Sequence, residues 1–219
     1  VALPPSSFAR ALAAGSPVRY ALVVGNNEGR TPPGVTLPPL LHAERESRRI
    51  GAALAQVGHF DRAGGRLIVL TGATREAILQ AAARLAAKRR QDQRLFGKSP
   101  TLFALFFTGH GLAGQLLTGS APLTGKDLAR IFKRMSATFT VGVFDACYSG
   151  ALNHETLRAK GLRSTPGFNA FKALPTEVLT AKGTMWFVSS RPDQVSYEDR
   201  KLGGLFSHFF MEGMRQAPK

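Results

Sequence analysis

Five short apolar runs, separated by segments of helical character, constrain the fold of this chain more than any other feature. Runs of this length with few polar residues are typical of strands that are covered on both faces. Strands that alternate with helices along a chain form a parallel sheet with helices on both faces. The sequence therefore predicts an α/β sandwich with a mostly parallel sheet. The five runs cover residues 20–24, 66–70, 102–107, 138–144 and 184–189.

Four helices are expected between and after these runs. Thr74 precedes the second helix and is a typical N-cap residue. Thr124 and Asp127 open the third helix with the spacing of a capping box. The fourth helix is expected to turn its phenylalanines toward the core, namely Phe206, Phe209 and Phe210. The helices should cover residues 40–57, 75–90, 124–135 and a segment after residue 204.

The remaining segments suggest one domain with a loose start and an internal linker. The chain has 219 residues, which is an ordinary size for a single α/β domain. Residues 1–18 are rich in Ala, Pro and Ser and are interpreted as a leader, and residues 19–219 as the domain. Residues 31–39 hold four prolines and are expected to form a loop. Residues 153–182 have weak periodicity and are expected to form a linker.

The chain is strongly basic, with 29 Lys+Arg against 14 Asp+Glu and a formal net charge of +15. An excess of this size suggests a nucleic-acid partner. The basic residues are dispersed, however, and no aromatic residues interleave with the densest block. Solvated helix faces or an acidic partner are the simpler explanations of the charge. A basic nucleic-acid-binding module therefore ranks third among the interpretations of function. The densest block consists of Arg84, Lys88, Arg89, Arg90, Arg94 and Lys98.

The lone cysteine, Cys147, excludes an internal disulfide. No second cysteine or spaced His/Asp cluster accompanies it, so neither a metal site nor a cofactor is expected. Residues 25–29 contain two glycines but lack the Lys-Ser/Thr of a phosphate-binding loop. No apolar run approaches the roughly 18 residues of a membrane span, so none is expected.

Chemistry is expected where the third and fourth apolar runs end. In open parallel sheets, functional sites form beyond the carboxyl ends of the strands. Gly109-His110-Gly111 follows the third run, and Asp145-Ala146-Cys147 follows the fourth. A cysteine or a histidine alone would be read as an ordinary core or surface residue. Together at one sheet edge they suggest a thiol nucleophile with an imidazole base, and the Gly111 and Cys147 amides could bind an oxyanion.

These motifs resemble those of the caspase-like cysteine peptidases, and most of all the bacterial metacaspase-like branch. The resemblance rests on the Thr-Gly-His110-Gly and Asp145-Ala-Cys147-Tyr148-Ser-Gly segments and extends over residues 19–215. It implies the caspase-type three-layer sandwich, with an intersubunit linker at residues 153–182. It further implies that Cys147 is the nucleophile, that His110 is the general base and acid, and that the Gly111 and Cys147 amides form the oxyanion hole.

The resemblance also bears on specificity. Three positions that form the basic pocket of caspases correspond here to Leu41, Asp145 and a residue near Glu198. Metacaspases use the Asp two residues before the cysteine and an acid in the first helix, which would match Glu46 or, less closely, Glu44. A buried carboxylate pair favours a cationic partner. Cleavage of protein or peptide substrates after Arg or Lys is therefore expected. The expected substrate-binding residues are Asp145, Glu46, Glu198 and Tyr197.

Two further expectations follow from the resemblance. Basic residues in the linker suggest that the enzyme cleaves itself there. A regulatory domain or a partner chain is the second expectation. Many metacaspases are activated by calcium, but the sequence shows no evident cluster of calcium ligands.

Tyr148 stands where the family usually has His, and the last edge strand is not visible before Lys219. A catalytically impaired scaffold that binds peptides is therefore the second interpretation. The basic linker residues are Arg158, Lys160, Arg163, Lys172 and Lys182.

Overall fold

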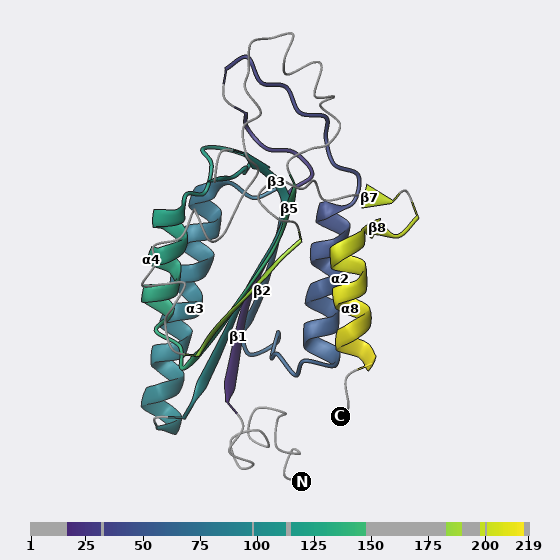
Figure 1. Ribbon diagram of the computed structural model, residues 1–219. Helices are drawn as coiled ribbons and strands as arrows, with labels where there is room; N and C mark the ends of the chain where they lie inside the picture. The colour runs from purple at the N-terminus through teal and green to yellow at the C-terminus, as the bar shows by residue number, and fades with distance from the viewer. Residues whose placement is uncertain are drawn as a thin grey trace.

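A six-stranded sheet forms the centre of the molecule, with helices packed on both of its faces (Figure 1). The computed structural model describes residues 17–31, 33–97, 99–112, 115–147, 183–189, 198–199 and 201–216. Five strands are parallel in the order β2-β1-β3-β5-β6, and the short β4 (Gln115–Leu116) pairs antiparallel with β3. The predicted α/β three-layer sandwich is confirmed. The parallel strands are β1 (Val18–Gly25), β2 (Leu67–Thr71), β3 (Thr101–Leu112), β5 (Phe139–Cys147) and β6 (Thr184–Val188).

Among the described residues, two helices cover each face of the sheet. α3 (Arg75–Phe96) and α4 (Gly125–Met135) lie on one face, and α2 (Ala43–Gln56) and α8 (Leu205–Gln216) lie on the other (Figure 1). Successive side chains of a strand point to opposite faces. Leu22 of β1 therefore packs in the core under α3 and α4, and Val23 packs in the core under α2 and α8. None of the described helices combines the length and apolarity needed to cross a membrane.

The starts predicted for α3 and α4 from their capping residues are confirmed, whereas α2 begins at Ala43 rather than at residue 40. The Thr74 hydroxyl oxygen accepts a hydrogen bond from the Ala77 N–H at 3.2 Å, and Thr124 and Asp127 form the reciprocal bonds of a capping box. Arg75, the first residue of α3, donates two hydrogen bonds of 2.6 and 2.9 Å to Asp127. Burial alone would raise the pKa of Asp127, but the bonds from Arg75 and Thr124 outweigh it and lower that pKa. The Arg75–Asp127 pair thus ties the start of α3 to the start of α4.

A buried polar network centred on Asp92 connects β1, α3 and the segment before β2. The Tyr20 hydroxyl donates to Asp92 at 2.8 Å, Arg66 donates twice at 2.9 and 3.0 Å, and Lys88 lies 3.0 Å away. Arg66 also contacts Asp61 at 2.6 Å. Burial would raise the pKa of Asp92, but the hydrogen bonds from Arg66, Lys88 and Tyr20 hold it below its usual value. Burial and the bond to Asp92 raise the pKa of the Tyr20 hydroxyl.

Two strands are longer than the sequence indicates, and the extra residues carry the functional motifs. β3 does not end at residue 107 but continues to Leu112, because β4 supplies partners for its end and Gly111 lies opposite Leu116. β5 does not end at residue 144 but continues to Cys147, which pairs with His110 of β3. The two motifs therefore lie within the sheet edge rather than in loops after it.

Other boundaries also differ from the expected ones. β1 begins at Val18, a residue assigned to the leader, because its N–H donates to the Pro100 carbonyl. α3 continues beyond residue 90 to Phe96. A small antiparallel pair, β7 (Glu198–Asp199) and β8 (Gly203–Gly204), was not expected, since strands of two residues carry no periodic pattern. Residues 1–16 of the expected leader and the whole expected linker lie outside the described residues.

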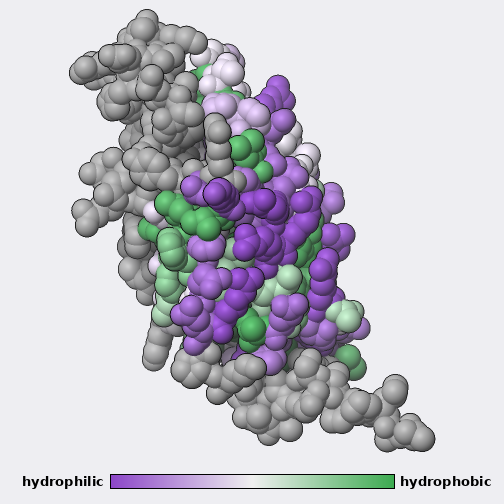
Figure 2. All heavy atoms as spheres, turned by 90° about the vertical axis from the view of Figure 1, so that its right-hand side faces the viewer, coloured by the Kyte–Doolittle hydropathy of each residue, from purple (hydrophilic) through white to green (hydrophobic). Residues whose placement is uncertain are grey.

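The orientation expected for the phenylalanines of α8 is wrong in one case. Phe210 packs against Phe106 and Phe187, with ring centroids 5.6 and 5.5 Å apart, and Phe206 packs in the same core. Phe209 is 64% exposed. Consecutive helical residues are about 100° apart around the axis, so with Phe210 directed at the sheet Phe209 lies at the margin of the contact face. Figure 2, which views the molecule from the α8 side, shows a mainly hydrophilic face with smaller apolar patches.

Candidate active site

The register of the central strands places the two expected catalytic residues next to each other. β3 and β5 are parallel neighbours, and His110 is directly paired with Cys147. Paired residues of adjacent strands have Cα atoms about 4.8 Å apart. His110 is buried, with 2% of its surface exposed. The structure describes the backbone of Cys147, which lies at the carboxyl end of β5. The pairing of an imidazole-bearing and a thiol-bearing position at one sheet edge is the arrangement that the sequence predicts.

The imidazole of His110 is oriented by the loop before α2. His110 Nε2 lies 2.9 Å from the Pro38 carbonyl oxygen. A carbonyl oxygen can only accept, so Nε2 carries the proton in this contact, and Nδ1 is the basic nitrogen of the neutral ring. Sequence reasoning missed Pro38. The proline-rich segment predicts only a loop, and nothing in its sequence indicates a contact with a residue 72 positions away.

Two of the expected substrate-binding acids lie close together near the sheet edge that carries His110 and Cys147. Glu46 lies in the first turn of α2 and Asp145 lies on β5, and they are 1% and 6% exposed. Asp145 Oδ2 and Glu46 Oε2 lie 2.9 and 3.1 Å from the point that a Cβ on Gly204 would occupy. Asp145 is two residues before Cys147 and therefore on the same face of β5. We call Glu46 and Asp145 the acid pair.

The acid pair is held by the start of α8 and by β3. Ser207, the third residue of α8, donates to Asp145 Oδ2 from its hydroxyl at 2.6 Å and from its N–H at 3.2 Å. The Gly204 N–H donates to Glu46 Oε1, and the Thr108 hydroxyl donates to Glu46 Oε2 at 3.3 Å. Each of these donors is an uncharged hydroxyl or N–H group. Sequence reasoning identified neither Gly204 nor Ser207 as part of this region.

The remaining expected site residues are placed as follows. Gly111 directly follows His110 within β3. The backbone of Glu198 pairs with Gly204, next to the acid pair. Leu41 is 66% exposed just before α2. Glu44 lies outside the acid pair, because its carboxylate forms a 3.8 Å ion pair with Arg48. Tyr148 and Tyr197 lie outside the described residues, as do the side chains of Cys147 and Glu198.

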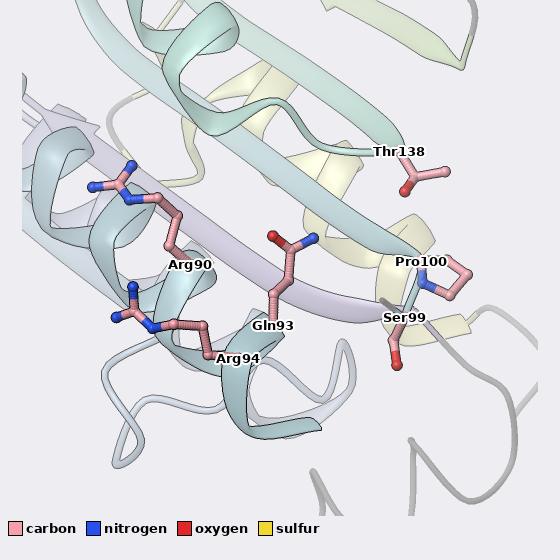
Figure 3. Close-up of a pocket in the computed structure, with 6 residues that line it drawn as sticks. All are labelled: Arg90, Gln93, Arg94, Ser99, Pro100 and Thr138. Atoms are coloured by element: carbon pink, nitrogen blue, oxygen red, sulfur yellow. The ribbon is translucent and has the colours of Figure 1, made fainter. Parts of the chain in front are cut away.

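A cavity of about 620 Å³ lies away from these residues. Thr138 and Pro100 border it at the amino ends of β5 and β3, whereas His110 lies nine residues beyond Thr101, the first residue of β3. Nine residues of a strand span about 30 Å. Figure 3 shows Arg90 and Arg94 beside it on α3, so its lining is basic. In the part of the chain that the structure describes, no group of three or more His, Cys, Asp or Glu residues could hold a metal ion.

Comparisons with known proteins agree with this architecture. A solved structure, caspase-1 from Spodoptera frugiperda, is similar over 92% of this chain and 70% of that chain, with a TM-score of 0.60 and 16% sequence identity. At this identity the likeness shows the fold alone. No curated protein matches the chain. A family model described as the caspase domain matches residues 18–219, nearly the whole length. The chain therefore belongs to the caspase-domain family of peptidases.

Proposed function

We propose that this chain is a cysteine endopeptidase in which Cys147 is the nucleophile and His110 is the general base and acid. The observation that carries the proposal is the direct pairing of these two residues on β3 and β5. The Pro38 carbonyl supports it, because it holds the Nε2 proton and leaves Nδ1 as the basic nitrogen of His110. A base oriented by a third group is the usual arrangement for activating a nucleophile.

The proposed reaction proceeds in two steps. The thiol proton of Cys147 passes to His110 Nδ1, and the sulfur attacks the scissile carbonyl carbon. The carbon–nitrogen bond breaks as His110 returns the proton to the leaving amine. Water then attacks the thioester while His110 accepts a proton from that water. The carbon–sulfur bond breaks, the carboxylic product leaves, and His110 returns the proton to the sulfur of Cys147. The Gly111 and Cys147 N–H groups would stabilise the negative oxygen formed in each step.

The proposed substrate is a protein or peptide with Arg or Lys at the cleaved position, as in the metacaspase-like branch. Two buried carboxylates lie on the same side of the sheet as the proposed nucleophile, and a buried negative charge favours a cationic ligand. The hydrogen bonds from Gly204 and Ser207 orient these carboxylates but add no positive charge. We propose that the basic side chain of the substrate binds next to these two carboxylates. The reaction as written requires no cofactor.

Hydrolysis of fluorogenic peptides that differ only at the cleaved position tests this function. Wild type is expected to cleave Arg and Lys peptides, and Cys147→Ala and His110→Ala are expected to lose that activity. A preference for Asp over Arg would contradict the specificity. Activity retained in Cys147→Ala would contradict the nucleophile. Each assay is run with and without calcium, which shows whether the ion activates the enzyme.

A catalytically impaired peptide-binding scaffold is the second candidate. It is favoured by the existing hydrogen bonds of the acid pair, from Gly204 of β8 to Glu46 and from Ser207 of α8 to Asp145. Gly204 lies between the two carboxylates. Under this alternative, wild type binds an Arg peptide but hydrolyses none of the peptides, with or without calcium. Turnover that depends on both Cys147 and His110 would exclude it.

A further inference from the structure

We propose that Ser207 is a positioning residue for substrate specificity, and that it acts with Gly203 and Gly204 to fix the acid pair in the orientation that receives a basic side chain. The inference rests on the proposed function, because it concerns the same two carboxylates. It assigns a role in specificity to the start of α8, a segment that carries no nucleophile, base or acid of the proposed reaction.

On the Asp145 side, two donors from one residue converge on one oxygen. The Ser207 hydroxyl lies 2.6 Å from Asp145 Oδ2 and the Ser207 N–H lies 3.2 Å from the same atom. The terminal torsion of an aspartate is broad, so a single contact leaves the carboxylate free to rotate. Two donors on one oxygen restrict that rotation. Ser207 is itself 2% exposed, which shields both bonds from competition with water.

On the Glu46 side, the backbone of β8 is the restraint. The Gly204 N–H donates to Glu46 Oε1, and a Cβ on Gly203 would lie 2.2 Å from that oxygen. Gly203 has φ +88°, a conformation that favours glycine. Glu46 therefore lies against a stretch of backbone that tolerates no side chain. The Thr108 hydroxyl, 3.3 Å from Glu46 Oε2, holds the other carboxylate oxygen from β3.

The two restraints belong to one continuous segment. The first N–H groups of a helix have no partner within the helix, and Asp145 accepts one of them from Ser207. Because Gly204 and Ser207 are three residues apart, the start of α8 sets the position of Glu46 relative to Asp145. A purely structural role for the Ser207 hydroxyl predicts only a loss of stability when it is removed. A positioning role predicts a selective loss of affinity for a cationic side chain.

The test compares binding of two peptides to the inactive Cys147→Ala protein. One peptide ends in arginine and the other in citrulline, its neutral analogue of nearly the same shape. Calorimetry gives the dissociation constants of both peptides, and their ratio is the arginine preference. The ratio is measured for Cys147→Ala alone and for three double variants, in which Cys147→Ala is combined with Ser207→Ala, Ser207→Thr or Thr74→Ala. Thr74→Ala is the matched control, since it removes a helix-capping bond at the start of α3 instead. Unfolding midpoints are measured for every variant.

The preference for arginine is expected to fall about tenfold in the Ser207→Ala protein, the size typical for losing a hydrogen bond to a charged group. It should be retained with Ser207→Thr and with Thr74→Ala. In the active protein, Ser207→Ala should raise KM for the Arg peptide and change kcat less than about twofold.

Two results would overturn the inference about Ser207, and a third would overturn the proposed specificity on which it rests. An unchanged arginine preference in Ser207→Ala, or an equal loss in Ser207→Ala and Thr74→Ala, shows that Ser207 is only structural. The proposed function then still stands if wild type cleaves the Arg peptide and Cys147→Ala does not. Absence of any arginine preference in the Cys147→Ala parent contradicts the proposed specificity and the role of Ser207 with it.

Discussion

At the scale of single residues, the two acids in the first turn of α2 are only two positions apart but have different surroundings. Glu46 is 1% exposed and contacts Gly204 and Thr108, whereas the Glu44 side chain is 28% exposed and pairs with Arg48. Positions i and i+2 on a helix face different directions. The sequence left the choice between the two open, and the structure selects Glu46 as the neighbour of Asp145.

This difference predicts unequal effects of the same substitution. Glu46→Gln removes the charge next to Asp145, so kcat/KM for an Arg peptide should fall about tenfold or more. Glu44→Gln removes a charge that is paired near the surface and should change kcat/KM less than about twofold. Steady-state kinetics of the two variants checks the prediction. Equal effects of the two substitutions would show that the acid pair does not recognise the residue after which the substrate is cleaved.

At the scale of elements, the buried network around Asp92 joins β1 to α3 and should contribute to stability. Asp92→Asn weakens the bonds from Arg66 and Lys88 and should lower the free energy of unfolding by about 3 kcal/mol at pH 7. The pKa of Asp92 is lower in the folded protein than its usual value of 3.8. The stabilisation is therefore present above pH 3.8 and is lost as the pH falls through the lower folded value.

Urea denaturation of wild type and Asp92→Asn at several pH values measures this effect. The difference in unfolding free energy between the two proteins should be constant near pH 7 and should shrink progressively below about pH 4. A difference that grows on acidification would contradict the assigned sign.

The β8 segment provides a second prediction at this scale. Gly203 and Gly65 have similar positive φ values, +88° and +73°, but only Gly203 has a carboxylate where a Cβ would lie. Gly65→Ala should lower stability by about 1 kcal/mol through backbone strain alone. Gly203→Ala should lower stability further and also raise KM for an Arg peptide, because it displaces Glu46. Thermal unfolding and kinetics of both variants separate the two contributions.

At the scale of the whole molecule, the sheet and its order of elements could be predicted from the sequence, because apolar runs and helix caps are local signals. The adjacency of His110 and Cys147 followed from the same pattern, since both motifs come at the ends of buried runs. Pro38 and Ser207 could not be found in this way. Each acts through a contact between distant segments, 72 and 62 positions apart, and neither belongs to a periodic pattern.

Self-processing is a prediction about the whole chain. A peptidase that cleaves after Arg or Lys should cut its own expected linker, residues 153–182, which contains two Arg and three Lys residues. Intact-mass spectrometry of purified wild type should show fragments that end at a basic residue of this segment, and Cys147→Ala should remain uncut. The same cut in the mutant would assign it to another peptidase.

The most direct test of the central claim is covalent labelling with a peptidyl chloromethyl ketone that carries Arg at the position next to the reactive group. The thiolate displaces chloride and forms a carbon–sulfur bond, so each labelled molecule gains the mass of the peptide ketone. Peptide mapping is expected to locate one label on Cys147 in wild type, slower labelling in His110→Ala, and little labelling by the corresponding Asp reagent. Equal labelling by the Asp reagent, or no dependence on His110, would contradict the proposed Cys147–His110 peptidase with its acidic pocket.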